Sequence, residues 1–480
     1  MYPLNYLDIL DEDLILLRQE EPRNTSRITL HEKYKDKLII NPKLNRSLIS
    51  FQANKNEPIY RWFKYKEGFS SKFVKYILET FIKPGSNQVV LDPFSGIGTT
   101  ITTALETGYN SIGIELLSPA ILATEARILA HRIDINEMNE SLSNIKSIDF
   151  SDKSVPKKYF FNHLTITKGA FPDETEIGIA IVNRFIDTKI SNQDIKTLMR
   201  FAVSSILEDV SYTRKDGQYL RWDYRSKRDL KTLFNKGVIY PFRERLIDKL
   251  YDIISDIKNS PSKEIKHTHT LINGSSLFEL HKINSESVDI VITSPPYCNR
   301  YDYTRTYALE LAYNGTDNNS IKQLRQTLLS ATVENKSKFI NLQDFYECIG
   351  KKEFFESAVT NFKENEALNE ALRSLNYYRN HLNNKNIPIM VANYFFEMNL
   401  IVAELARILK KGGKVIMVND NVRYNGDEIQ VDLILSEFAA KTGLKTDYIW
   451  ILERGKGNSS QQMGLHGRQE IRKCVYVWSK

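Results

Sequence analysis

The sequence predicts an α/β fold in which a parallel sheet carries helical insertions. Two apolar runs, 89–91 and 288–293, each lead directly into a turn that is rich in glycine or proline. After the first turn come a helical segment and another apolar run, 111–114, so that a strand, a turn, a helix and a strand follow one another within about 30 residues. Long polar and helical stretches separate this unit from the later strands. Together these observations predict a Rossmann-like sheet interrupted by insertions.

Helix and strand signals along the chain define the expected elements. The apolar spacing of Phe73–Phe81 predicts a helix that Lys83-Pro84-Gly85 ends. Val89–Leu91 predicts a buried strand, and a helix to Thr107 and a strand over Ser111–Ile114 follow it. Further elements are expected at Asp194–Asp209 (helix), Thr268–Ile272, Val288–Thr293, Leu400–Leu409 (a helix stopped by Lys410-Lys411-Gly412-Gly413) and Val415–Val418. An antiparallel hairpin over 446–453 and 471–478, joined by the Gly-rich loop Gly455–Gly467, is expected to close the sheet.

A chain of 480 residues exceeds one ordinary domain, so we expect a catalytic domain with additional modules. Residues 1–50 are polar and contain three proline breakers, which indicates an N-terminal extension outside the core. The catalytic domain is expected in three parts, 51–130, 266–314 and 386–480. Between them lie a helical and basic insertion, 131–265, and a second helical insertion, 315–385.

Composition indicates the broad class of protein. Apolar residues make up 41% and charged residues 26%, and the net charge of +7 permits a nucleic-acid partner. The three cysteines lie far apart, which argues against a disulfide framework or a zinc module, so no metal site is expected. The N-terminus lacks the basic start of a signal peptide, and no apolar run reaches membrane-spanning length. We therefore expect a cytoplasmic protein without a membrane partner.

The first turn, which begins at Asp92 and ends at Thr100, has the features of a cofactor cradle. Its two glycines let the backbone approach a ligand closely, and the free amides of the following helix favour an anion. In S-adenosylmethionine the anion is the methionyl carboxylate, while Asp92 would accept from the ammonium and Glu115 from the ribose hydroxyls. The structural alternative is a tight turn without a ligand, and Ile101 argues against a dinucleotide because it replaces the third glycine of GxGxxG. The predicted cofactor residues here are Asp92, Pro93, Phe94, Gly96, Gly98, Thr99, Thr100, Glu115 and Leu116.

The second turn, Thr293-Ser294-Pro295-Pro296-Tyr297, ends another apolar strand and should face the same crevice. Its residue types suit methyl transfer to an exocyclic amine, whose lone pair is conjugated with the base. The Ser294 hydroxyl and the Pro295 carbonyl could each accept one amine hydrogen and so aim the lone pair at the methyl group. Paired prolines fix that carbonyl, and Tyr297 offers a ring face to a flipped base. The catalytic candidates are Ser294, Pro295, Pro296 and Tyr297, although a rigid loop without such a role has the same sequence features.

The two turns together resemble those of the bacterial DNA amino-methyltransferases, the modification partners of restriction enzymes. Three flanking segments are similar as well: 63–70, which adds Phe63 and Tyr65 as cofactor residues, 273–276, and the helix that runs into 407–413. Ser275 stands where the family often has an aspartate that contacts the cofactor adenine. The resemblance covers about half of the chain and implies S-adenosyl-L-methionine as cofactor, double-stranded DNA as substrate and a restriction endonuclease of the same specificity as partner.

Within this family, a serine before PPY is similar to cytosine-N4 enzymes, whereas aspartate or asparagine is typical of adenine-N6 enzymes. The resemblance thus favours cytosine-N4 and keeps adenine-N6 as the alternative, with an RNA base-amine enzyme or a non-catalytic DNA-binding module as further ones. A cytosine-C5 enzyme needs a Pro-Cys nucleophile, whereas Cys298 follows Tyr297, so we expect Cys298 to be a wall residue. The cofactor turn precedes the catalytic turn, which is the unpermuted order.

Two basic and aromatic segments are candidates for DNA contact. Residues 212–249 carry eleven basic and five acidic side chains, among them Arg221, Arg225, Lys227 and Arg228. A solvated helical face has the same composition. Directly after the catalytic turn, Arg300, Tyr301 and Arg305 could reach the flipped nucleotide or its phosphates, or could serve helix-start packing. The loop 455–467 could close over the base.

Overall fold

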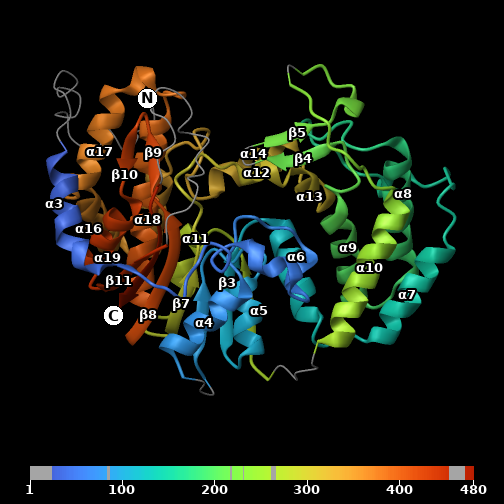
Figure 1. Cartoon of the computed structure of the whole chain (residues 1–480), viewed down its shortest axis with the longest axis horizontal. Coiled ribbons are helices and arrows are strands. Elements are labelled where there is room, and N and C mark those ends of the chain that lie inside the picture. Colours follow the sequence, from blue (N-terminus) through green and yellow to red (C-terminus); the bar gives the residue numbers. More distant parts are fainter. Residues whose placement is uncertain (1–23, 84–86, 217–218, 231, 261–265, 453–470) are drawn as a thin grey trace.

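The computed structural model describes residues 24–83, 87–216, 219–230, 232–260, 266–452 and 471–480 (Figure 1). The predicted α/β class is confirmed by an eight-stranded sheet in the order β1-β11-β12-β8-β7-β2-β3-β6. Strand β12 is antiparallel to both of its neighbours, and the other neighbouring pairs are parallel. The strands of this sheet are β1 (Leu38–Ile40), β2 (Val89–Asp92), β3 (Asn110–Glu115), β6 (His269–Asn273), β7 (Val288–Thr293), β8 (Leu409–Asp420), β11 (Lys445–Ile451) and β12 (Lys473–Ser479).

Strands β2 and β7 lie next to each other in the middle of the sheet, with Val90 opposite Ile290 and Leu91 opposite Val291. From β2 the chain moves outward to β3 and β6, and it then returns to β7 and β8 on the other side. The strand order therefore reverses between β2 and β7. In open α/β sheets the crevice at such a reversal is where ligands bind, so both predicted turns emerge at the expected place.

Successive side chains of these strands point to opposite faces of the sheet, as the two-residue period of a strand requires, and so pack against two different layers of helices. Val90, Ile290 and Ile292 face α4 (Ser71–Phe81) and α5 (Thr99–Glu106). Leu91 and Val291 face the opposite layer. That second layer contains α3 (Thr25–Tyr34), α15 (Phe339–Cys348), α16 (Lys352–Lys363), α17 (Glu366–Tyr377), α18 (Ile387–Ile408) and α19 (Val431–Lys441). Helices on both faces explain why these strands are apolar throughout.

The junction of α18 and β8 differs from the sequence prediction. A helix over Leu400–Leu409 stopped by 410–413 is expected, but α18 ends at Ile408 and β8 begins at once. Residues 410–413 form an irregularity inside β8, because Leu409 pairs with Val288 whereas Lys414 pairs with Ile290. At Gly413 an added Cβ would lie 2.9 Å from the Asp289 carbonyl oxygen. The glycines therefore admit a bulge within the strand instead of separating helix from strand.

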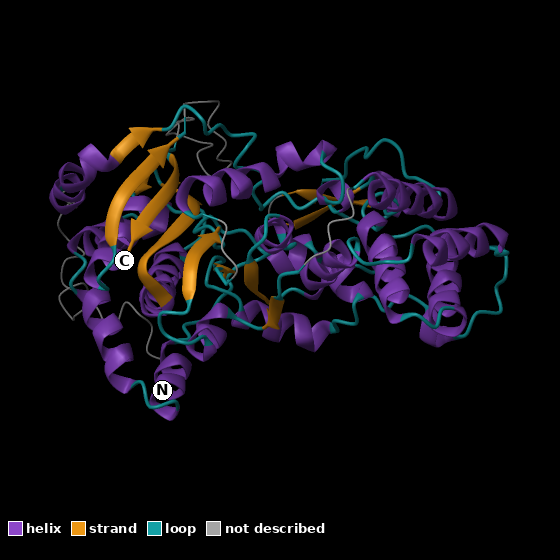
Figure 2. Ribbon diagram, turned by 90° about the horizontal axis from the view of Figure 1, so that it is seen from below, coloured by secondary structure: helices purple, strands orange, loops and turns teal. Residues whose placement is uncertain are grey.

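The first insertion forms a helical lobe at one end of the molecule, on the right in Figure 1. With α6 (Ser118–Leu129) and α13 (Ala308–Tyr313), its helices share a core that also includes Trp62, Phe63 and Tyr65. The predicted helix Asp194–Asp209 corresponds to α9. The elements of the lobe are α7 (Ile135–Ser147), α8 (Asp173–Lys189), α9 (Gln193–Ile206), β4 (Thr213–Asp216), β5 (Tyr219–Trp222) and α10 (Phe242–Asn259). Seen from below, the lobe and the C-terminal strands lie at opposite ends (Figure 2).

The described part of the N-terminal segment belongs to the core, which corrects the expectation of an extension outside it. Leu30, Tyr34 and Leu44 are buried, and β1 adds a parallel strand beside β11. Helix α3 packs against α17 and α19, where Arg27 pairs with Glu370 (2.9 Å). The polar composition of the segment conceals these few buried side chains, while residues 1–23, including the expected absence of a signal peptide, lie outside the described part.

The remaining elements are short, apart from one long apolar helix. Helix α18 is long and apolar enough to cross a membrane, but 94% of its most apolar stretch is buried inside the protein, as in a core helix. The predicted closing hairpin is present as β11 and β12, and its loop, 455–467, lies outside the described residues. The short elements are α11 (Ser276–Glu279), α12 (Tyr303–Thr306), α14 (Asn318–Thr327), β9 (Val422–Tyr424) and β10 (Asp427–Ile429).

Candidate active site

The turn after β2 is shaped by two glycines with different tasks. Both have positive φ, +51° at Gly96 and +71° at Gly98, a region that favours glycine. A Cβ on Gly96 would lie 3.2 Å from the Tyr65 ring, whereas a Cβ on Gly98 would lie 2.4 Å from Thr124 of α6. Gly96 therefore lets the turn pass close to the ring of Tyr65, and Gly98 lets α5 pack closely on α6.

A cavity of about 760 Å³, a volume that includes space open to solvent, lies at the carboxyl ends of β2 and β7. Many of the predicted cofactor and catalytic residues line it: Tyr65, Asp92, Pro93, Phe94, Gly96, Thr99, Glu115, Leu116, Ser275, Ser294 and Pro296. The two turns that were singled out separately in the sequence thus meet at one cavity.

Two acidic residues, buried Asp92 and half-buried Glu115, line this wall. Asp92 accepts hydrogen bonds from the hydroxyls of Thr293 (2.7 Å) and Thr100 (2.8 Å), and Glu115 accepts from the amides of Leu116 and Leu117 (both 2.8 Å). Burial raises the pKa of Asp92 to about 6 and that of Glu115 to about 7, although these hydrogen bonds oppose the rise. At neutral pH Asp92 is therefore largely ionised and Glu115 only partly so, and both can accept from cationic or hydroxyl donors.

The Asp92–Thr293 hydrogen bond joins the two turns, because Thr293 is the last residue of β7 and directly precedes Ser294. Ser294 donates its hydroxyl hydrogen to the Tyr297 hydroxyl oxygen at 3.3 Å, which leaves the lone pairs of the Ser294 oxygen as acceptors. Pro295 is buried and Tyr297 half-buried. Burial also raises the pKa of Tyr297, so this phenol stays neutral.

Three of the predicted cofactor residues lie outside the cavity wall and support it from behind. Thr100 is fully buried, and its hydroxyl positions Asp92. Gly98 faces α6 as described above. Phe63 packs against Phe201 and Tyr307 in the core of the helical lobe.

Several cavity residues were not predicted from the sequence. Glu67 lines the cavity and accepts hydrogen bonds from the hydroxyls of Tyr301 and Tyr307. These bonds connect the cofactor-side segment 63–70 to the stretch after the catalytic turn. Tyr303, Leu328 and Leu329 also line the cavity, the last two from the second insertion. The acidic residue among the aromatic residues of segment 63–70 was a usable sequence signal for Glu67, but no local pattern indicates Leu328 or Leu329.

Most of the proposed DNA-contacting side chains engage partners within the chain. Arg225 pairs with the buried Asp223 (2.7 Å), and Arg228 stacks on Trp222 (3.9 Å from guanidinium to ring centroid). Arg221 stacks on Phe234 and pairs with Asp216, while Arg305 pairs with Asp302 and Glu334.

One of the predicted DNA-contacting cations is freely accessible, since Lys227 is exposed at a positive φ. Arg300 is half-buried, and its Nε atom is buried without a hydrogen-bond partner among the described residues.

Cys298 was predicted to be a wall residue, but it lies in the core and is not among the residues that line the cavity. It is fully buried in the layer that contains α18, and its thiol is not oxidised in a disulfide. Burial raises the pKa of the Cys298 thiol, so no thiolate nucleophile is present.

Comparison with known proteins places this geometry in a family. The family model for N6/N4 DNA methylases matches residues 5–124. Over 476 residues the chain is 43% identical to the type II methyltransferase M.BsoBI of Geobacillus stearothermophilus, which covers 95% of this chain and 92% of that protein. The chain belongs to the type II DNA methyltransferases of the N6/N4 family. This methyltransferase is also 42% identical over 462 residues to M.AvaI of Anabaena variabilis, with 94% and 92% of the two chains covered. No solved structure matches it.

Membership in the family establishes the cofactor as S-adenosyl-L-methionine and the substrate as DNA. The cavity of this methyltransferase fits the cofactor by the chemistry of its wall. Asp92 and Glu115 provide acceptors for an ammonium and for ribose hydroxyls, and the amides at the start of α5 face an anion. Ser275 offers a hydroxyl where an aspartate is common, so an adenine amine would meet a neutral group there.

Proposed function

We propose that this methyltransferase transfers a methyl group to N4 of cytosine within a specific double-stranded DNA sequence. The observation that carries the proposal is the position of Ser294. This neutral hydrogen-bond acceptor lies on the cavity wall and directly follows Thr293, whose hydroxyl donates to Asp92. In the family that the chain resembles, serine at this position is typical of cytosine-N4 enzymes. Adenine-N6 methylation is the alternative.

The residues of the catalytic turn would work by positioning. The Ser294 oxygen and the Pro295 carbonyl would each accept one hydrogen of the amine, which favours a pyramidal nitrogen whose lone pair leaves the ring plane. The bound S-adenosyl-L-methionine supplies the electrophilic methyl group. Tyr297, kept neutral by its raised pKa, would pack against the flipped base. No covalent intermediate is needed, which agrees with the buried thiol of Cys298.

The face beside α12 is the proposed DNA surface. Strand β5 lies next to α12 (Figure 1), and Lys66, which lies between the cavity residues Tyr65 and Glu67, donates to the Lys215 carbonyl (3.3 Å). The β4–β5 hairpin is therefore close to two segments that contribute residues to the cavity. The loop after β5 exposes apolar side chains together with its cations: Tyr224, Leu230, Leu233, Val238 and Tyr240. Exposed apolar groups among cations suit contact with base edges as well as with phosphates. Lys227 and Arg300 are the proposed phosphate ligands, while Arg225 and Arg228 would shape the loop.

Nucleoside mass spectrometry tests the base assignment. Unmethylated plasmid DNA is incubated with the purified enzyme and deuterated-methyl cofactor, digested and compared with untreated DNA. Labelled N4-methylcytosine is expected, and labelled N6-methyladenine alone would refute the proposal. A tRNA substrate in a parallel reaction should take up no label. Sequencing of methylated sites after expression in an unmethylated host then gives the recognition sequence.

The biological setting is proposed from the same family. A cytoplasmic enzyme with this activity would protect the host chromosome against a restriction endonuclease that recognises the same sequence. The expected result is that DNA methylated by this protein resists one such nuclease and that unmethylated DNA is cut.

A further inference from the structure

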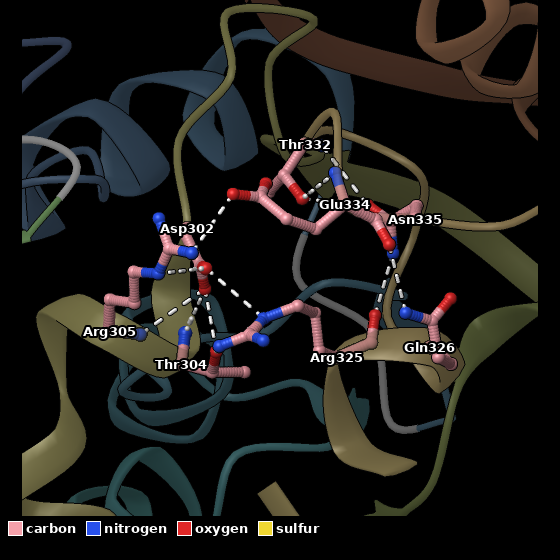
Figure 3. Close-up of polar contacts among 8 residues, drawn as sticks. All are labelled: Asp302, Thr304, Arg305, Arg325, Gln326, Thr332, Glu334 and Asn335. Atoms are coloured by element: carbon pink, nitrogen blue, oxygen red, sulfur yellow. Dashed lines mark hydrogen bonds and ion pairs between the residues drawn. The ribbon is translucent and has the colours of Figure 1, made fainter. Parts of the chain in front are cut away.

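The stretch after the catalytic turn is tied to the second insertion by a compact polar cluster (Figure 3). At its centre is Asp302, whose side chain is 3% exposed. One of its oxygens accepts from the amides of Thr304 (3.0 Å) and Arg305 (3.2 Å) and so caps α12. The other oxygen forms ion pairs with Nε of Arg325 (3.1 Å) and Nε of Arg305 (3.3 Å). We call Asp302, Thr304, Arg305, Arg325 and Glu334 the Asp302 cluster.

Arg325 of α14 makes the connection between the two segments. Its Nη2 and Nε atoms donate to the Thr304 hydroxyl at 2.9 and 3.1 Å, in addition to the ion pair with Asp302. Its backbone carbonyl accepts from the side-chain amide of Asn335 (2.7 Å), which holds the loop after α14. Arg305 completes the cluster through an ion pair with Glu334 (3.0 Å) on that loop. The planar, forked guanidinium of Arg325 thus fixes the orientation of α14 relative to α12 as well as the distance between them.

Each side of the cluster is next to a cavity residue. Tyr303, which directly follows Asp302, lines the cavity, and so do Leu328 and Leu329, which directly follow α14. The next residue, Ser330, is held separately, because its amide and hydroxyl donate to the buried Glu397 of α18 at 2.8 and 2.6 Å. The Asp302 cluster therefore lies between two parts of the cavity wall, Tyr303 and Leu328–Leu329.

The Asp302 cluster lies beside the core of the helical lobe. Within the ten residues of α14 only Ile321 is buried, while Tyr303, Leu324 and Leu328 are half-buried against that core. Buried ion pairs contribute little net stability, since the loss of hydration offsets their attraction, but they strongly restrict geometry. A polar cluster that joins two helices beside a binding cavity is accordingly better suited to positioning than to stability.

We propose that the Asp302 cluster is a positioning device that holds the Leu328–Leu329 wall against Tyr303 and thereby sets the affinity for the cofactor. Asp302 and Arg325 act through these wall residues and contact neither the cofactor nor the base. The inference rests on the assignment of the cavity as the cofactor site. When the cluster is broken, the wall is free to move apart and the bound cofactor loses contacts on one side.

Calorimetric titration of the full-length protein with S-adenosylhomocysteine, together with initial rates, tests the proposal. Arg325→Gln removes the cation and the fork. Its expected effects are a dissociation constant and a cofactor KM at least tenfold higher, with kcat at saturating cofactor within threefold of wild type. Arg325→Lys, which keeps the charge, should recover part of the affinity. Thr304→Val removes the hydroxyl that accepts from Arg325 and donates to Asp302 (2.6 Å) but keeps the Arg325–Asp302 ion pair. It should weaken binding by a smaller factor and serves if Arg325→Gln does not fold.

The matched control is Arg27→Gln. Arg27 is also a buried guanidinium between two carboxylates, Glu370 (2.9 Å) and Asp427 (2.5 Å), but it joins α3 to α17 and β10 at the far side of the sheet. It should lower the melting temperature and leave the dissociation constant within twofold of wild type. If Arg27→Gln weakens binding as much as Arg325→Gln, the effect is general destabilisation and the proposal is wrong.

A further variant tests separately whether the cavity is the cofactor site and whether the Asp302 cluster positions its wall. Glu115→Gln should weaken binding if the cavity is the cofactor site. Weak binding by Glu115→Gln together with unchanged binding by folded Arg325→Gln or Thr304→Val would overturn the role of the cluster alone. Unchanged binding by Glu115→Gln and by the cluster variants would overturn the cavity assignment and, with it, the proposal.

Discussion

The substitution Asp92→Asn should make the protein more stable at pH 8 while it weakens cofactor binding. Asp92 is 2% exposed, and the amide of asparagine can take its place without losing partners. The amide oxygen would accept from Thr293 and the Phe94 amide, as one carboxylate oxygen does now. The amide nitrogen would donate to the Thr100 hydroxyl, which can still donate to the Ile292 carbonyl.

The size of the effect follows from the cost of the buried charge. Because burial raises the pKa of Asp92 from 3.8 to about 6, ionisation costs the folded protein about 3 kcal/mol relative to the unfolded chain. Between these two values the folded protein binds more protons than the unfolded chain, so its stability falls as pH rises. The asparagine variant does not titrate and avoids this loss, which amounts to about 3 kcal/mol at pH 8 and about half of that at pH 5.

Urea unfolding of both proteins at pH 8 and pH 5 measures the difference, and Glu115 is present in both. An advantage of the variant that shrinks by about half at pH 5 is expected. A variant that is less stable at pH 8, or a difference that does not depend on pH, would refute the reasoning. Calorimetry should show roughly 10- to 100-fold weaker cofactor binding, since a hydrogen bond to a charged group contributes about 1.5–3 kcal/mol.

Three other variants test separate parts of the molecule. Ser294→Ala should lower kcat by roughly 10- to 100-fold, the effect of losing one acceptor in the transition state, with a cofactor dissociation constant within twofold; equal losses in both would contradict its role. Gly98→Ala should destabilise the fold by roughly 2–5 kcal/mol in urea, through its positive φ and the contact with Thr124, and Gly98→Ala with Thr124→Ala should regain the part due to the contact. Lys227→Ala should weaken DNA binding, measured by filter binding, and reduce the slope of log K against log salt by about 1. Arg225→Ala should instead lower the free energy of unfolding by roughly 1–3 kcal/mol, because the buried Asp223 loses its ion-pair partner. The reverse pattern, in which Lys227→Ala affects stability and Arg225→Ala affects DNA binding, would overturn these assignments.

The two turns were predictable because local sequence determines them. A short apolar strand followed by Gly-rich or Pro-rich residues fixes a strand end, and parallel strands put their carboxyl ends at one edge. The same local signals also pointed to Gly98 and Thr100 as cofactor residues, although both lie behind the cavity wall. Whether a residue of this turn lines the cavity, as Gly96 and Asp92 do, or packs behind it depends on its tertiary neighbours, which spacing along the sequence does not encode.

Features that depend on distant partners escaped prediction. Glu67 meets tyrosines more than 230 positions away, and Leu328 lines the cavity from the second insertion, far along the chain from both turns. Helix α18 was recognised only at its end, because it is buried on nearly all sides and therefore lacks the one-sided pattern of a surface helix. Strand β1 is three residues long, too short for any periodic signal.

The position of β12 has a consequence for how the chain acquires its fold during synthesis. This strand leaves the ribosome after every other described strand, yet it lies between β8 and β11 with both faces covered. Until it arrives, β8 and β11 present open hydrogen-bonding edges beside the apolar α18, a state that is prone to aggregation. Chaperone capture of nascent chains should therefore be strongest after β11 has emerged and should end when β12 inserts. Premature stop codons before residue 473 would then yield insoluble protein even though both turns of the active site are complete.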